Sequence, residues 1–332
     1  MPIRSVRVPL SYLALSGALV LIAPASPQAL PLDHLLEDPA SARTFDYGAL
    51  RDHLGGGDLK TLNAEVRDAV AARVAKAPNG CETQAEAFVR EGMASTLAAS
   101  EAAAWRTDWT AATAMLDRLN ARTTLVLAGG GAGLPGYGGV RDDLKAAKTA
   151  ADPRHRELFR RAASDQASRE VWKDVWALPQ GPRRRMISAP LSAEGCRVDA
   201  DNTQWLKAEW RRSGWFTAAR DGAAASQRAW LIVQHADNDP QFQRDLLPTL
   251  ARDTDPQSRI NYAYLADRVA TNANQPQTFG TQGRCVAPDR WEPFPVQDPH
   301  GLDARRAALG LPPEAEYATH AAPVCAHYKA PT

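Results

Sequence analysis

The sequence predicts an all-α protein, with a helical N-terminal unit and a helical C-terminal domain that ends in an irregular, proline-rich tail. Two observations indicate this class. Apolar residues recur at the three- and four-residue spacing of a helix through most of the chain. No series of alternating apolar and polar residues, the pattern of strands, is visible. We therefore expect helices packed on helices, with irregular segments near residues 129–139 and after residue 274.

Two helical segments are predicted between residues 59 and 119. The segment 83–119 is rich in alanine, has few β-branched residues and carries Trp105 and Trp109 on one face. The segment 59–74 places apolar residues at every fourth position, which are Leu62, Val66, Val70 and Val74.

The C-terminal half continues the helical pattern through the segments 154–176, 201–212 and 222–236. Two later helices begin alike, each with an Asp-Pro pair, at Asp239 and at Asp255. The aspartate can accept hydrogen bonds from the free amides of the first turn, and proline fits that turn because no amide is needed there. Both positions are therefore predicted helix starts.

A glycine-rich segment at residues 131–136 matches G-x-G-x-x-G, the fingerprint of dinucleotide-binding proteins. That chemistry needs a helix whose N-terminus faces the pyrophosphate. Here Pro135 precedes the last glycine, and no surrounding β-α-β pattern is evident, although the segment 123–128 could be a strand. We interpret residues 129–139 as a connecting loop that binds no nucleotide.

That loop divides the chain. We expect a signal peptide at residues 1–25, an N-terminal helical region at 26–128, a glycine-rich linker and connecting helix at 129–151, and a C-terminal helical domain at 152–328.

The first residues predict export. Arg4 and Arg7 precede an uncharged, mostly apolar stretch, and Ala23-Pro24-Ala25 supplies small residues for cleavage after Ala25. The stretch is shorter than the roughly 20 residues of a membrane span. An uncleaved N-terminal anchor is the alternative. We expect an exported protein, periplasmic or extracellular, that does not span the membrane after cleavage.

The charge of the chain indicates no polyanionic partner. Of its 39 basic residues, Arg4 and Arg7 lie in the segment to be removed, which leaves 37 against 38 acidic residues. A nucleic-acid binder would carry a basic stripe or domain. The short runs at 183–185 and 305–306 are interpreted as solvated faces, so no nucleic acid is expected as a partner.

The four cysteines predict two disulfides, because an even number in an oxidising compartment favours pairing. None lies in a C-x-x-C pair, so neither a zinc knuckle nor a thioredoxin-type site is indicated. Three pairings are possible. We favour Cys285–Cys325, which would hold a proline-rich tail that packs weakly by itself, and by subtraction Cys81–Cys196.

The C-terminal half resembles a bacterial family, the domain of unknown function 6624, over roughly residues 152–317. The resemblance rests on D-Q-x-x-R at 165–169, W-L-I-V-Q-H-A-D at 230–237, D-R-V at 267–269, G-T-Q at 280–282 and the stretch 302–317. The chain departs from the pattern at Phe216, where proline is expected, and at Phe279, where tyrosine is expected. The resemblance implies no activity.

The candidate site is the polar group around His235. An imidazole titrates near neutral pH, so His235 is a candidate general base, with Asp237 or Asp267 in support. On a helix over 222–236, Gln234 and Asp237 would be drawn inward beside apolar residues and would need partners. The candidate binding residues are Gln234, Arg268, Gln277, Thr281 and Gln282.

No recognisable catalytic motif accompanies this group. No serine or cysteine has the context of a nucleophile, and no paired-histidine spacing indicates a metal, so neither metal nor cofactor is predicted. Two functions remain. The first is a binding or interaction module for an unknown small molecule or envelope component. The second is a hydrolase-like envelope enzyme with His235 as base. Alternatively, His235 is a hydrogen-bonded core residue without a function of its own.

Overall fold

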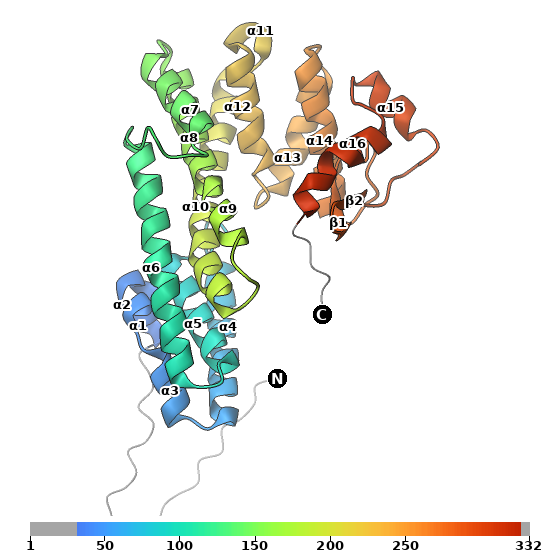
Figure 1. The fold of residues 1–332 in the computed structure, drawn as a ribbon. Coiled ribbons are helices and arrows are strands. Elements are labelled where there is room, and N and C mark those ends of the chain that lie inside the picture. The colour runs from blue at the N-terminus through green and yellow to red at the C-terminus, as the bar shows by residue number, and fades with distance from the viewer. Residues whose placement is uncertain (1–31, 327–332) are drawn as a thin grey trace, which may run out of the picture.

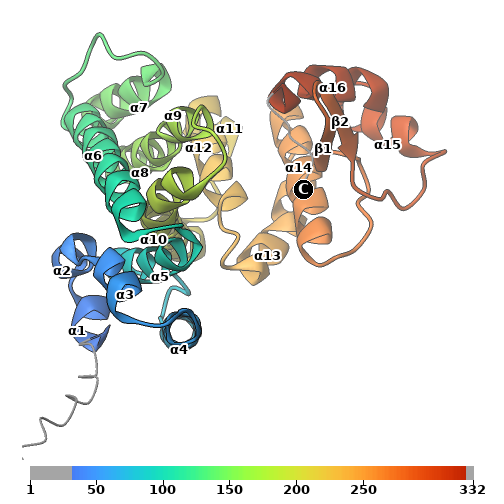
Figure 2. The same ribbon diagram turned by 60° about the horizontal axis from the view of Figure 1, so that its bottom comes forward.

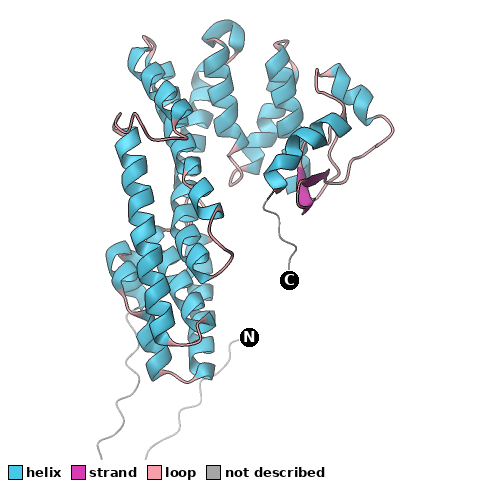
Figure 3. Cartoon of the chain, in the orientation of Figure 1, coloured by secondary structure: helices cyan, strands magenta, loops and turns pink. Residues whose placement is uncertain are grey.

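The computed structural model describes residues 32–326, and helices make up most of that part of the chain (Figures 1 and 3). The predicted all-α class is confirmed. The predicted signal peptide lies outside the described residues. The helices of the N-terminal part are α1 (Leu32–Glu37), α2 (Pro39–Thr44), α3 (Tyr47–His53), α4 (Gly56–Val74), α5 (Gln84–Ala98), α6 (Ala102–Leu127) and α7 (Gly138–Thr149).

The C-terminal part adds further helices and a small antiparallel hairpin. Its elements are α8 (Pro153–Glu170), α9 (Trp172–Trp176), α10 (Pro182–Ser213), α11 (Ala218–Asp221), α12 (Ala223–Gln234), α13 (Pro240–Ala251), α14 (Pro256–Asn272), β1 (Gly283–Ala287), β2 (Arg290–Pro293), α15 (Leu302–Ala308), α16 (Glu314–Ala321) and the 3-10 helix η1 (Ala322–Cys325).

The long helix α10 joins the two ends of the helical array. Its 32 residues extend roughly 48 Å at the usual rise per residue. One end packs against α5 and α6, and the other contacts α8 and α12 (Figures 1 and 2). The sequence predicted only the segment 201–212 as a helix there. Pro190, which ordinarily disrupts a helix interior, lies inside α10 and is buried.

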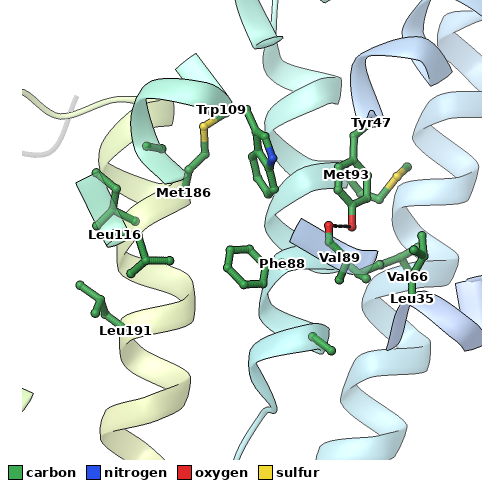
Figure 4. Close-up of a cluster of buried hydrophobic side chains, with 14 of the residues drawn as sticks. Leu35, Tyr47, Val66, Phe88, Val89, Met93, Trp109, Leu116, Met186 and Leu191 are labelled. Atoms are coloured by element: carbon green, nitrogen blue, oxygen red, sulfur yellow. Dashed lines mark hydrogen bonds between the residues drawn. The ribbon is translucent and has the colours of Figure 1, made fainter. Parts of the chain in front are cut away.

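The main core lies between α10 and the N-terminal helices. Met186, Ile187 and Leu191 from α10 are buried against aromatic and aliphatic residues of α3, α5 and α6, as Figure 4 shows for its labelled side chains. Trp105 and Trp109 stack with their ring centroids 5.0 Å apart and are both buried, as expected from their shared face. A second core joins α8, α10, α12, α13 and α14.

The predicted helix over 83–119 is two helices. The helix is interrupted between α5 and α6. Across this interruption, the indole N–H of Trp105 donates a hydrogen bond to Ser95 Oγ at 2.9 Å. No glycine or proline marks this break, so tertiary packing decides it. The strand considered over 123–128 is wrong, because α6 continues to Leu127. Residues 128–137 then form a loop, which confirms most of the loop predicted at 129–139, but α7 already begins at Gly138.

Both predicted disulfides are present. Cys81–Cys196 joins the segment before α5 to α10, and Cys285–Cys325 joins β1 to η1. The hairpin itself was not expected. Its strands are only five and four residues long, and Asp289 at the turn has a positive φ of 52°. Among residues 32–326, no helix is both long and apolar enough to cross a bilayer.

Candidate ligand-binding site

His235 lies where the chain leaves α12, and its ring is held by an aspartate from another helix. Ile232 and Val233 are buried and fix the end of α12 in the second core. The Nδ1 atom of His235 lies 2.9 Å and 3.1 Å from the two carboxylate oxygens of Asp165, on α8. A carboxylate only accepts, so Nδ1 carries the proton and donates it to this bond.

The other ring nitrogen is consequently an acceptor in the neutral imidazole. Gln234 Nε2 lies 3.3 Å from His235 Nε2, and its amide N–H is the donor in this arrangement. Only 13% of the His235 side chain is exposed, and 1% of Asp165. The imidazole is therefore held in one orientation and one tautomer.

Asp165 also lies at the centre of a charged chain between α8 and α10. Gln166 Nε2 donates to one of its oxygens at 2.7 Å, and Arg169 Nη1 lies 3.0 Å from the other. Arg169 then donates through Nη2 to both oxygens of Asp199, at 2.9 and 3.1 Å. Burial raises the pKa of the Asp199 carboxyl, although the charge and hydrogen bonds of Arg169 act in the opposite direction.

A second ion pair borders the same region. Arg268, on α14, donates through Nε and Nη2 to the two oxygens of Asp237, at 2.8 and 2.5 Å. Burial alone would raise the pKa of Asp237, but the hydrogen bonds and charge of Arg268, together with hydrogen bonds from Gln243 and Asn272, outweigh it and the pKa is lowered. The expectation that Asp237 points inward is wrong: α12 ends at Gln234, so Asp237 leaves the helix face and is 45% exposed.

These groups surround a cavity of about 390 Å³ between α8, α9, α10, α14 and the loop after α12. A drug-sized ligand typically needs a cleft of about 300–1,000 Å³. The wall offers donors, acceptors, hydroxyls and an indole. The lining residues are Ser168, Arg169, Trp172, Leu191, Ser192, Gly195, Cys196, Asp199, His235, Asp237, Asn238 and Arg268.

A larger cavity of about 590 Å³ lies next to this one and shares Asn238 with it. Its charged lining residues are Lys207, Arg211 and Asp239. Asp239 pairs with Lys207 and accepts from the Phe242 amide as the cap of α13, which confirms the predicted helix start. Because no histidine lines it, the smaller cavity is the better candidate for acid–base chemistry.

Asp267 belongs to a different network. Its buried carboxylate accepts from the backbone amides of Thr278, Phe279 and Thr281 and from the Thr281 hydroxyl, at 2.8–3.2 Å. Gly280, with φ of 65°, lets the backbone turn around this carboxylate. The predicted support of His235 by Asp267 is therefore wrong, because both carboxylate oxygens of Asp267 are engaged by the loop 278–281.

The remaining predicted binding residues lie with Asp267. Gln277 donates to the carbonyl oxygens of Gln282 and Phe294, both at 2.8 Å, and accepts from the Gln282 amide. Gln282 Nε2 also contacts the Thr281 hydroxyl. Of the sequence candidates, His235, Asp237 and Arg268 line the cavity, and Gln234 contacts His235.

Sequence reasoning missed Asp165, Arg169 and Asp199 as members of the site. Asp165 and Arg169 lie four residues apart on α8 and pair with each other. Their link to His235 was not expected, because Asp165 lies 70 residues earlier in the chain. The available signal was the D-Q-x-x-R motif itself, which places an acid and a base on one helix face.

Three of these groups also form a potential metal-ligand set. Each of Asp165, Asp199 and His235 offers one ligand atom, and these atoms lie within 4.8 Å of one another. Spacing along the chain could not reveal this set, since it comes from three separate elements. Arg169 already contacts both carboxylates, so a metal ion would have to displace its guanidinium.

The fold and the site together define a helical protein with a small polar cleft beside an oriented histidine. Residues 154–322 match the model of a family of unknown function (DUF6624), and the chain belongs to this family. Comparison with curated proteins and with solved structures gives no match.

Proposed function

We propose that this protein is an exported binding protein whose cavity beside His235 takes a small polar ligand from the cell envelope. The observation that carries the proposal is the lining of the 390 Å³ cavity, where His235 lies among two arginines and two carboxylates. Such a set can donate to and accept from one ligand at the same time. Since Asp165 holds His235 and Arg268 is bidentate on Asp237, part of the lining is oriented before a ligand arrives.

Export is supported by the charged, apolar and small-residue pattern of residues 1–25 and by the two disulfides. Disulfides persist in oxidising compartments and are rare in the cytosol. N-terminal sequencing of protein from the cell envelope or the medium should find a mature chain that begins near Ser26. Recovery of intact Met1 in cytoplasmic material would contradict export.

A second candidate function is hydrolysis, with His235 as general base. It is favoured by the Asp165–His235 contact, in which the aspartate orients the ring and leaves Nε2 as the proton acceptor. Asp165 would then have the supporting role that the sequence assigned to Asp237 or Asp267. Ser192 lines the cavity, and a bound water is the other possible nucleophile.

Variants of His235 and Asp165 distinguish the two candidate functions. Thermal-shift titration of the mature protein against a panel of polar metabolites should give ligands whose stabilisation is lost in His235→Gln. The matched control is His53→Gln, at an exposed histidine on α3, which should respond like the unaltered protein. If His235→Gln and the unaltered protein respond equally to a ligand that neither of them turns over, the proposed site is overturned.

Product analysis of each ligand found then tests for turnover. Binding without turnover supports the binding protein. If a ligand is hydrolysed, and if His235→Gln and Asp165→Asn still bind it but no longer hydrolyse it, the enzyme is the correct function.

A further inference from the structure

We propose that the ligand is a saccharide, and that Trp172 and Trp176 form an aromatic platform leading out of the cavity. This inference rests on the proposed function, since it assigns a chemical class to the ligand of the same cavity. The juxtaposition behind it is a polar cavity with one indole in its wall and a second indole exposed beside the first.

The platform is formed by the short helix α9. Trp172 and Trp176 lie four residues apart, with ring centroids 6.2 Å apart and planes inclined by 35°. Trp172 lines the cavity, whereas 59% of Trp176 is exposed. An indole this exposed, beside a second indole that lines a cavity, offers an apolar surface that a ligand in the cavity can cover with a gain in burial energy.

The helix that carries the platform is held in place. Val175 is fully buried in the main core, between the two tryptophans in sequence. Asp174 pairs with Arg122 of α6, and Lys173 pairs with Glu170 of α8 at 2.7 Å. Two planar rings on a fixed helix lose little conformational entropy when they bind, which favours their use as contact surfaces.

A sugar ring fits both parts of this site. One face of a pyranose presents C–H groups, which pack on an aromatic face, and its edge presents hydroxyls that both donate and accept. The cavity wall supplies acceptors in Asp199 and Asp237, donors in Arg169 and Arg268, and the amide of Asn238, which does both. A terminal sugar would occupy the cavity, and further units would extend over Trp176.

The charge of the site favours a saccharide over other ligands that stack on indoles. Asp165, Asp199 and Asp237 face two arginines, Arg169 and Arg268, so the local charge is about −1 with neutral His235. A nucleotide would bring its phosphates toward Asp199 and Asp237 in the cavity wall, and the two arginines there are already engaged by carboxylates. An organic cation would gain from the indoles, but each carboxylate is already paired with an arginine.

The test is isothermal titration of the mature protein with chitotetraose, cellotetraose and maltotetraose, with the metabolite panel titrated in parallel. We expect at least one tetrasaccharide to bind and to change tryptophan fluorescence. Trp176→Ala should weaken that binding by about tenfold, the loss of one stacked ring. Leu125→Ala, at a 50% exposed apolar residue on α6, is the matched control and should leave binding within about twofold.

Each of the other outcomes would overturn the saccharide, the platform or the binding site itself. If no tetrasaccharide binds, while a metabolite binds and is lost in His235→Gln, the saccharide is overturned and the binding site stands. Absence of binding in both panels would overturn both proposals. If a tetrasaccharide binds equally well to Trp176→Ala, the platform is overturned. A change of oligomeric state in Trp176→Ala without any loss of saccharide binding would assign the exposed indole to contact between copies.

Discussion

Two buried aspartates have different tasks because their nearest donors differ. Asp165 accepts from an imidazole and a guanidinium that border a cavity, so a ligand can reach the groups it holds. Asp267 accepts from three backbone amides and a hydroxyl inside the protein, which closes the loop 278–281 around it. The same residue type therefore orients a candidate functional group in one case and fixes the backbone in the other.

Asp267→Ala should destabilise the protein without altering the cavity beside His235. The change leaves the backbone amides of Thr278, Phe279 and Thr281 without their acceptor, at a cost of about 3 kcal/mol or more in the free energy of unfolding. Urea denaturation measures this difference. Asp68→Ala, at an exposed position on α4, is the control and should change stability by about 0.5 kcal/mol or less. Equal stability of the two variants would show that the loop does not depend on Asp267.

Among the elements, the hairpin and the tail depend most on covalent support. Strands β1 and β2 are short, and an isolated two-stranded hairpin is marginally stable in water. The Cys285–Cys325 bridge attaches β1 to η1, and Trp291 and Tyr317 pack edge to face with ring centroids 5.5 Å apart. The disulfide therefore restrains a segment with little core of its own.

Removal of that bridge in Cys285→Ser/Cys325→Ser should lower the free energy of unfolding by about 2–4 kcal/mol. Hydrogen exchange should quicken at the amides of 283–293, because the hairpin loses its attachment to η1. The control is Cys81→Ser/Cys196→Ser, which should leave those amides protected. Unchanged exchange of the hairpin in the first variant would contradict this assignment.

For the whole molecule, the notable feature is a core shared across the chain. Val175, Met186, Ile187 and Leu191 lie in the part predicted as the C-terminal domain, yet they are buried in one cluster with the N-terminal helices. The Cys81–Cys196 bridge links the same two parts. The division into regions 26–128 and 152–328 stays a prediction, but neither part buries this cluster by itself.

A chain that begins at residue 152 should therefore be less stable than the mature protein. Truncation exposes the apolar end of α10, so we expect stronger binding of the dye 8-anilinonaphthalene-1-sulfonate and a lower, broader thermal transition by circular dichroism. A truncated chain that unfolds as cooperatively as the mature protein and binds no dye would support two independent domains.

The sequence by itself determined the properties that depend on local periodicity and on the even number of cysteines. Helical spacing gave the all-α class, Asp239 and Asp255 cap their helices as their Asp-Pro pairs predicted, and the cysteines pair as expected. The order of motifs gave the family. Each of these properties depends on residues close together in the chain, on the order of motifs or on the number of cysteines. It can therefore be predicted without knowing how the helices pack.

Only the tertiary structure decided which carboxylate serves His235. The sequence offered Asp237 and Asp267, which lie nearer in the chain, whereas the structure places Asp165 against Nδ1 and Asp199 beyond Arg169. Likewise, it separated Asp267 from the cavity and brought the indole of Trp172 into the cavity wall. The physical reason is that contacts between helices follow from how their apolar faces pack, and that packing joins residues whose distance along the chain carries no signal.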